Sequence, residues 1–191
     1  GDALREGQDD AVLLALQLQE EVGLDVVTDG EQRRRHYIDS FCAALDGFDY
    51  TRLVEKATRG GRYSARVATV ERPVERVRPV LLEALRFAQA HTNRPVKVTI
   101  PGPMTIVDTA HDEYYGDERA FAAALAAVIN AEARDLAAAG AAVVQIDEPC
   151  FNVYLDKVEA WGVELLDRCL EGVTCRTAVH VCYGYGTPAV L

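Results

Sequence analysis

The chain has 191 residues, 49% of them apolar, which is enough for one substantial core or two small ones. This composition excludes a disordered protein, and no apolar run approaches the ~20 residues that a membrane-spanning helix requires. The formal charge of −10 argues against a nucleic-acid partner, which would need a basic face. Residues 1–10 lack a signal-peptide core, and the five cysteines are odd in number and irregularly spaced, so we expect reduced thiols in the cytoplasm.

The first third of the chain predicts a helix, a short strand and an irregular excursion. Apolar residues recur at helical spacing up to Gly23, a typical residue after a helix end; they are Ala11, Leu14, Leu18 and Val22. Residues 24–28 are predicted to form a strand that ends in a polar turn. Residues 47–72 are rich in Gly, Arg and Tyr and fit neither pattern well, so we expect an excursion there, with a hairpin around Gly60 and Gly61.

The rest of the chain alternates helix and strand patterns. Pro79 is predicted at the first position of a helix that runs to about His91. Asp117 is predicted to cap the N-terminus of an alanine-rich helix that Gly140 ends, and a further helix is predicted over about 155–170. The predicted strands lie between these helices and after the last one, over residues 95–100, 142–146 and 177–182.

This alternation indicates parallel strands joined by helical crossovers. Their Val and Ile runs are typical of strands covered on both faces, and polar residues follow each strand, as in a (β/α)8 TIM barrel or an open doubly wound sheet. The barrel is favoured because no Gly-rich dinucleotide fingerprint follows a strand, although a barrel takes ~250 residues and only four good strands are present. We therefore expect one incomplete α/β TIM barrel over residues 1–191, with a small complete α/β domain as the alternative.

Two carboxylates and a glutamine stand out at the strand ends. Alternation places Gln145 and Asp147 on one strand face, where both are costly to bury without partners or a ligand. In the alternative interpretation, Asp147 only caps the following turn. Glu31 follows the tight turn at Gly30 and projects near another strand end, unless it is a solvated loop acid. The basic run 33–35 meets an anionic substrate tail or forms a solvated face.

The last predicted strand carries an imidazole and a thiol two positions apart. Residues i and i+2 of a strand point to the same face, so His180 and Cys182 are expected to aim at one point. This pair of ligands suits zinc, but two ligands do not complete a zinc site. Tyr183 and Tyr185, which follow, line a substrate pocket or only pack.

Taken together, four strand-end motifs resemble those of the cobalamin-independent methionine synthase family, over nearly all of the chain from about Gln8. The motifs are DGEQRR at 29–34, PGPMT at 101–105, QIDEP at 145–149 and HVCYGYG at 180–186. Their order and their places at the strand ends agree with the family as well. The resemblance is strongest to the short, single-barrel core members.

The resemblance implies a zinc-dependent enzyme that forms methionine by methyl transfer to the thiol of homocysteine. It implies that His180 and Cys182 are zinc ligands, which a glutamate and a cysteine from later strands complete. It also implies that Glu31 and Asp147 bind the amino group of homocysteine, and Gln145 is expected beside them in the substrate site. The first strand and the last strands of the barrel are expected to be missing from this chain. The methyl donor is methyltetrahydrofolate or another compound.

Two other interpretations remain open. A coenzyme M-type thiol alkyltransferase shares the zinc chemistry but needs no ammonium pocket, so the presence of both Glu31 and Asp147 favours homocysteine. With half of its zinc ligands missing, the chain is otherwise an inactive fragment or a structural module. A metal-free decarboxylase on a related barrel would leave His180 and Cys182 without a role.

Overall fold

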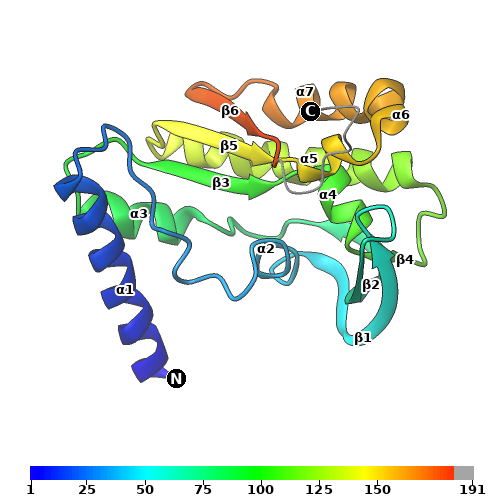
Figure 1. Ribbon diagram of the computed structural model, residues 1–191, viewed down its shortest axis with the longest axis horizontal. Coiled ribbons are helices and arrows are strands. Elements are labelled where there is room, and N and C mark those ends of the chain that lie inside the picture. The colour runs from blue at the N-terminus through cyan, green and yellow to red at the C-terminus, as the bar shows by residue number, and fades with distance from the viewer. Residues whose placement is uncertain (183–191) are drawn as a thin grey trace.

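The computed structural model describes residues 1–182 and consists of a helix-covered parallel sheet and a long antiparallel ribbon (Figure 1). Helix α1 and the ribbon lie at opposite ends of the molecule, with the sheet between them. Tyr183 and Tyr185 lie outside the described residues. Among the helices of the described chain, none combines the length and the apolar character needed to cross a bilayer.

The parallel sheet contains β3 (Lys97–Pro101), β5 (Val143–Asp147) and β6 (Arg176–His180), in that order. A single parallel bridge between Val27 and Val96 adds one more chain segment beside the start of β3. Spatial order therefore follows chain order, without the reversal that defines a doubly wound sheet. The described residues form a mixed α/β fold and do not close a barrel.

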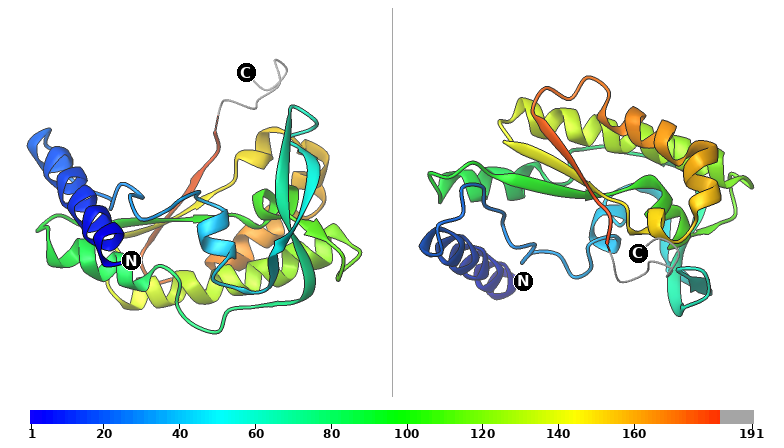
Figure 2. Two further views of the ribbon diagram at one scale, coloured as in Figure 1. Left: turned by 90° about the horizontal axis from the view of Figure 1, so that it is seen from below. Right: turned by 45° about the horizontal axis from the view of Figure 1, so that its top comes forward.

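The longer helices, which precede these strands or lie between them, also contact one another in chain order. They are α1 (Asp2–Glu21), α3 (Leu82–Ala90), α5 (Glu118–Ala138) and α7 (Val163–Leu170). Figure 2 shows α5 and α7 on one side of the sheet, and this face carries the fully buried side chains of Val144 and Ile146. As predicted, the Asp117 carboxylate caps α5 by accepting a hydrogen bond of 2.7 Å from the Ala120 N–H, and Gly140 follows the helix with a φ of +86°.

The segment expected to be irregular forms a regular ribbon of two long antiparallel strands. Strand β1 (Asp46–Thr58) pairs with β2 (Tyr63–Glu75), and the short β4 (His111–Asp112) pairs parallel to β2. The expected hairpin at Gly60 and Gly61 is confirmed, and both glycines have positive φ. Two register shifts in the pairing explain why the alternation of apolar residues is hard to follow in the sequence.

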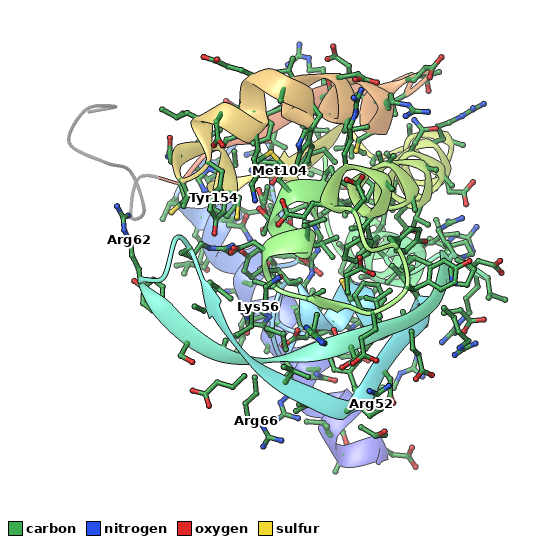
Figure 3. The ribbon with its side chains drawn as sticks, turned by 90° about the vertical axis from the view of Figure 1, so that its right-hand side faces the viewer. Arg52, Lys56, Arg62, Arg66, Met104 and Tyr154 are labelled. Atoms are coloured by element: carbon green, nitrogen blue, oxygen red, sulfur yellow. The ribbon has the colours of Figure 1, made fainter. Side chains whose placement is uncertain are left out.

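The tip of the ribbon is fixed to the body by buried polar contacts. The Arg59 guanidinium pairs with Asp108 at 2.6 Å, and both side chains are buried. Asp108 ends the short helix α4 (Pro103–Asp108). The Lys56 ammonium donates hydrogen bonds to the Val107 carbonyl near the end of this helix (3.0 Å) and to the Ala110 carbonyl just beyond it (2.7 Å). In Figure 3, Lys56 points toward the body, whereas Arg66 points away from it.

Three predicted element boundaries were wrong, and at two of them a side chain binds the backbone of the segment concerned. Residues 24–28 form only the bridge at Val27, since the Gln19 amide bonds both the N–H and the C=O of Thr28. Helix α3 begins at Leu82 instead of Pro79, and the buried Glu132 carboxylate accepts from the N–H groups of residues 80 and 81 just before it. Strand β6 ends at His180 instead of residue 182.

The predicted helix over 155–170 is divided into three pieces. Helix α6 (Leu155–Lys157) continues into a π-turn, η2 (Val158–Gly162), and then into α7. A Cβ at Gly162 would lie 2.6 Å from the Met104 sulfur, so a larger residue in this turn would require the Met104 side chain to shift. The remaining short elements are α2 (Asp39–Cys42) and η1 (Pro149–Asn152).

Candidate active site

Glu31 lies at the end of the chain segment that bridges to β3, in a strained turn. Gly30 and Glu31 both have left-handed backbone angles, with φ of +64° and +57°. Because Glu31 carries a Cβ, this conformation is costly for it, and the turn is supported by a 3.0 Å hydrogen bond from its N–H to the Asp29 carboxylate. The Glu31 carboxylate accepts a hydrogen bond of 2.5 Å from the Thr99 hydroxyl on β3.

Arg34 is the member of the basic run that belongs to this site. Its guanidinium donates to the hydroxyl and to the carbonyl oxygen of Thr99, both at 3.0 Å, and lies 3.4 Å from the Glu31 carboxylate. Its side chain is only 8% exposed. Arg33 instead stacks on the Phe87 ring, and Arg35 is exposed. The sequence does not distinguish the three arginines, because only the turn geometry selects the one that points inward.

Gln145 and Asp147 share one face of β5, as the alternation predicts. The Gln145 amide nitrogen donates to the Asp147 carboxylate at 2.7 Å, and the amide oxygen accepts from the Lys97 ammonium at 3.0 Å. In the parallel register, Gln145 lies opposite Thr99 of β3. Glu31 and Arg34 contact Thr99 on β3, and Gln145 and Asp147 lie on the adjacent β5, on the sheet face opposite the buried valine and isoleucine side chains of β5.

The electrostatics of Asp147 connect these groups. Burial raises the pKa of the Asp147 carboxyl, and the Glu31 charge adds to this rise. The hydrogen bond from Gln145 and the charges of His180 and Arg34 act in the opposite direction on the same pKa. Since Glu31 contacts Thr99, and Thr99 lies opposite Gln145 in the register, the two predicted carboxylates face a common region at the carboxyl ends of the strands.

His180 and Cys182 lie on the other side of Asp147. His180 is exposed, ends β6 and pairs in register with Asp147, while Cys182 is half-buried and lies two residues beyond the strand. Because β6 ends at His180, strand alternation does not set the direction of the Cys182 sulfur. The Cys182 carbonyl instead accepts a hydrogen bond of 2.5 Å from the Asn152 amide. Within residues 1–182, no three His, Cys, Asp or Glu side chains are grouped so that they could hold a metal ion. The two donors are of the types that zinc prefers, and their ligation stays a prediction.

Glu148 is a buried carboxylate that the sequence reasoning did not select. It accepts hydrogen bonds from the N–H groups of Met104 (2.8 Å) and Thr105 (3.0 Å) and from the Thr105 hydroxyl (2.7 Å). A Cβ at Gly102 would lie 2.2 Å from this carboxyl group, so the glycine is needed for the contact. Burial raises the pKa of Glu148 to about 7, against the opposing effect of these hydrogen bonds. Glu148 thereby joins the end of β5 to the start of α4.

Comparison with known proteins assigns the chain to a family. The model of the catalytic domain of the cobalamin-independent synthase matches residues 5–186. The chain belongs to this family. Methionine synthases of Sulfurisphaera tokodaii and Sulfolobus acidocaldarius are 36% and 35% identical to it over 182 residues, which is 95% of this chain but 53% and 52% of those proteins. This family member therefore spans about half the length of the curated relatives that it matches.

Solved structures agree with the family assignment. A B12-independent methionine synthase from Shewanella sp. W3-18-1, in complex with selenomethionine, is 43% identical with a TM-score of 0.92. The match covers 99% of this chain and 55% of that one. A putative B12-independent methionine synthase from Listeria monocytogenes shares the fold at 22% identity, with a TM-score of 0.76 and with 96% of this chain and 57% of that one covered.

Proposed function

We propose that this chain carries part of the active site of a zinc-dependent methyltransferase, which forms methionine by methyl transfer to the thiol of homocysteine. The observation that carries the proposal is the common region faced by Glu31, which contacts Thr99 on β3, and by Asp147 at the end of the neighbouring β5. Family membership supports it, and so does the complex of the Shewanella relative with selenomethionine, an analogue of the product. The second substrate is a methyl donor, methyltetrahydrofolate or another carrier.

In this proposal, Glu31 and Asp147 bind the substrate ammonium. Both carboxylates are already oriented by hydrogen bonds, from Thr99 and Gln145 respectively. Preorganised acceptors lose little entropy when the ammonium binds, and they hold the substrate thiol in line with the donor methyl group. Positioning of this kind lowers reaction barriers by several kcal/mol, up to about 7–11 kcal/mol in the best model reactions. Gln145 acts mainly through Asp147, since its amide bonds that carboxylate.

His180 and Cys182 would hold the zinc ion, together with ligands that the resemblance places in later strands. When bound, zinc converts a coordinated thiol to its thiolate, the nucleophilic form that is scarce at neutral pH in free thiols with a pKa of about 8.5. With only two ligands among residues 1–182, we expect this chain to bind zinc much more weakly than a complete four-ligand site. We also propose that the protein works in a reducing compartment such as the cytoplasm, in which its five cysteines stay free thiols.

We further propose that residues 1–191 form one partial (β/α)8 barrel whose open sides are closed by the half that the longer relatives possess. Strands of parallel sheets are normally covered on both faces, yet Val179 on β6 is 43% exposed. Helix α1 and its C-cap Val22 carry an exposed apolar stripe away from the buried side of the helix, with Leu14, Leu18 and Val22 each more than 60% exposed. A helix that is apolar on two sides is typical of a layer covered from both.

The closure can be tested with the segment of the Shewanella synthase that this chain does not match. We expect the two polypeptides to associate when mixed, as measured by analytical ultracentrifugation. Leu18→Glu is expected to weaken the association, because it places a charge in the apolar stripe. Leu155→Glu is the matched control, since Leu155 is also exposed (48%) but lies on α6, in another part of the molecule. Absence of association, or equal weakening by both variants, contradicts the closure.

The substrate proposal is tested by comparing L-homocysteine with 4-mercaptobutyrate, which lacks only the amino group. We expect calorimetric titration to give a dissociation constant for L-homocysteine about tenfold lower, because charge-assisted hydrogen bonds favour the ammonium. Asp147→Asn and Glu31→Gln should each reduce this preference. Glu83→Gln, a control at an exposed carboxylate paired with Arg5, should leave it unchanged.

Other outcomes identify the alternatives. Tighter binding of 2-mercaptoethanesulfonate than of L-homocysteine would favour a coenzyme M-type thiol alkyltransferase. Zinc is measured in the same samples by atomic absorption, with Cys182→Ser expected to remove it and Cys175→Ser, at another half-buried cysteine, as the control. A folded chain that binds neither zinc nor a thiol would be an inactive fragment or a structural module.

A further inference from the structure

Three polar side chains form a line across the sheet face that carries the candidate site. The Lys97 ammonium on β3 lies 3.0 Å from the Gln145 amide oxygen on β5, and the Gln145 amide nitrogen lies 2.7 Å from the Asp147 carboxylate. Lys97 and Thr99 point to the same face because they are two residues apart on β3. The line therefore runs beside the Thr99 contact with Glu31.

The chemistry of the two ends determines how the middle group is oriented. A lysine ammonium only donates hydrogen bonds, and an ionised carboxylate only accepts them. An amide between Lys97 and Asp147 satisfies both neighbours in one orientation alone, with its oxygen toward the lysine and its nitrogen toward the carboxylate. In the flipped orientation, the amide N–H groups would face the ammonium and the amide oxygen would face the carboxylate.

We propose that Lys97 is a positioning residue that fixes the Gln145 amide and, through it, the Asp147 carboxylate. The contribution to substrate binding rests on the proposed function, whereas the relay itself rests on the contacts. Lys97 is in hydrogen-bonding contact with Gln145, and the hydrogen bond to Asp147 is made by the amide nitrogen. The role is therefore distinct from that of a substrate-binding cation.

One oxygen of Asp147 is committed to this relay. The Gln145 amide bonds Oδ1, and among the described residues Oδ2 accepts no hydrogen bond. Fixing Oδ1 sets the rotation of the carboxylate, so that Oδ2 keeps one direction. A ligand with a primary ammonium group, such as an α-amino thiol, gains from an acceptor that is fixed in advance.

The second carboxylate has a matching arrangement. Arg34 donates to the Thr99 hydroxyl, which in turn donates to Glu31. Each carboxylate is thus linked to a cation through one neutral polar group, although Arg34 also lies 3.4 Å from Glu31 Oε1 directly. The two neutral groups, Thr99 and Gln145, are opposite each other in the strand register. Thr99 and Arg34 both contact Oε1 of Glu31, and Gln145 bonds Oδ1 of Asp147, so these described contacts leave the second oxygen of each carboxylate to a ligand.

The relay is tested first without any ligand, by NMR of the side-chain amide of Gln145 in this chain. The resonance is assigned by its loss in Gln145→Leu. In the wild type, we expect the amide protons to exchange slowly with water and to resonate downfield, as in a charge-assisted hydrogen bond. Lys97→Met should speed their exchange at least fivefold, and Lys97→Arg should restore slow exchange. Lys56→Met is the control, since it removes a half-buried lysine that also bonds carbonyl oxygens but lies on the ribbon.

The second test is a double-mutant cycle on L-homocysteine binding. Lys97→Met should raise the dissociation constant about tenfold in the wild-type background. In a Gln145→Leu background, the same change should have less than a twofold effect, because no amide remains for Lys97 to orient. A merely structural role for Lys97 would give the same loss in both backgrounds.

The possible results separate the relay from the substrate proposal. Unchanged amide exchange in Lys97→Met, or equal binding losses in the two backgrounds, would overturn the relay. If Lys97→Met does not fold, slow exchange of the Gln145 amide that persists in Lys97→Gln would overturn it as well. A relay seen by NMR in a protein that binds L-homocysteine and 4-mercaptobutyrate equally would uphold the relay and refute the substrate.

Discussion

The left-handed backbone of Glu31 predicts an unusual order of stability for two substitutions at this residue. Its φ of +57° costs a residue with a Cβ about 1–2 kcal/mol. Glycine avoids this cost but loses about 0.4–1 kcal/mol through its more flexible unfolded state. We therefore expect Glu31→Gly to be more stable than Glu31→Ala by about 0.5–1 kcal/mol, although both remove the same carboxylate.

Urea denaturation followed by circular dichroism measures this difference directly. The control is the same pair of substitutions at Glu6, an exposed residue inside α1. There alanine should be the more stable variant by about 1 kcal/mol, because glycine is the poorer helix former. Both Glu31 variants should bind L-homocysteine equally weakly. An alanine variant as stable as the glycine variant at residue 31 would refute the argument that the turn is strained.

Three further predictions concern the contacts around the site. Burial raises the pKa of Glu148 from 4.5 to about 7, so the folded state holds this proton more tightly than the unfolded state does. The free energy of unfolding should therefore fall by about 3 kcal/mol as the pH rises from 4.5 to 7. Urea titrations at several pH values should show this fall in the wild type and not in Glu148→Gln. Gly102→Ala should push the Glu148 carboxyl away and leave two buried N–H groups of α4 unpaired, which should lower the free energy of unfolding by about 2–6 kcal/mol. Gly7→Ala is the control: it has open space around it and should not destabilise the fold. Arg59→Met should lower stability by about 3–5 kcal/mol, because it leaves the buried Asp108 carboxylate without its cation. It should also release the ribbon, which faster amide exchange in β1 and β2 would show. Arg52→Met, the control, removes only exposed ion pairs and should cost less than about 1 kcal/mol.

The sequence was most informative where structure depends on local pattern. The three parallel strands, the cap at Asp117 and the shared face of Gln145 and Asp147 all follow from residue periodicity and from short-range chemistry. The boundaries that were wrong depend on distant side chains. Glu132, for example, holds the backbone before α3 from a helix some 50 residues later, and no local pattern announces such a contact.

The candidate site shows the same division. Glu31 and Asp147 were selected because each is an acid at a strand end. Arg34 and Lys97 were not, because an arginine among three neighbours and a lysine in a strand look like ordinary surface residues. Their importance comes from the register, which places Thr99 opposite Gln145, and register is a tertiary property. The direction of the Cys182 sulfur was also beyond reach, because β6 ends before that residue.

Asp147 and Glu148 illustrate how consecutive residues divide the tasks of a strand end. Asp147 faces the candidate site, while the next carboxylate is fully buried and binds the first N–H groups of α4. The Glu148 N–H also donates to the His180 carbonyl at 2.9 Å, so this residue ties β5 both to α4 and to β6. Because Glu148 is held by hydrogen bonds to both α4 and β6, the backbone of Asp147 has little freedom to move. A substitution that loosens Glu148 but leaves Asp147 in place should therefore weaken the proposed binding of L-homocysteine, although Glu148 itself does not face the site.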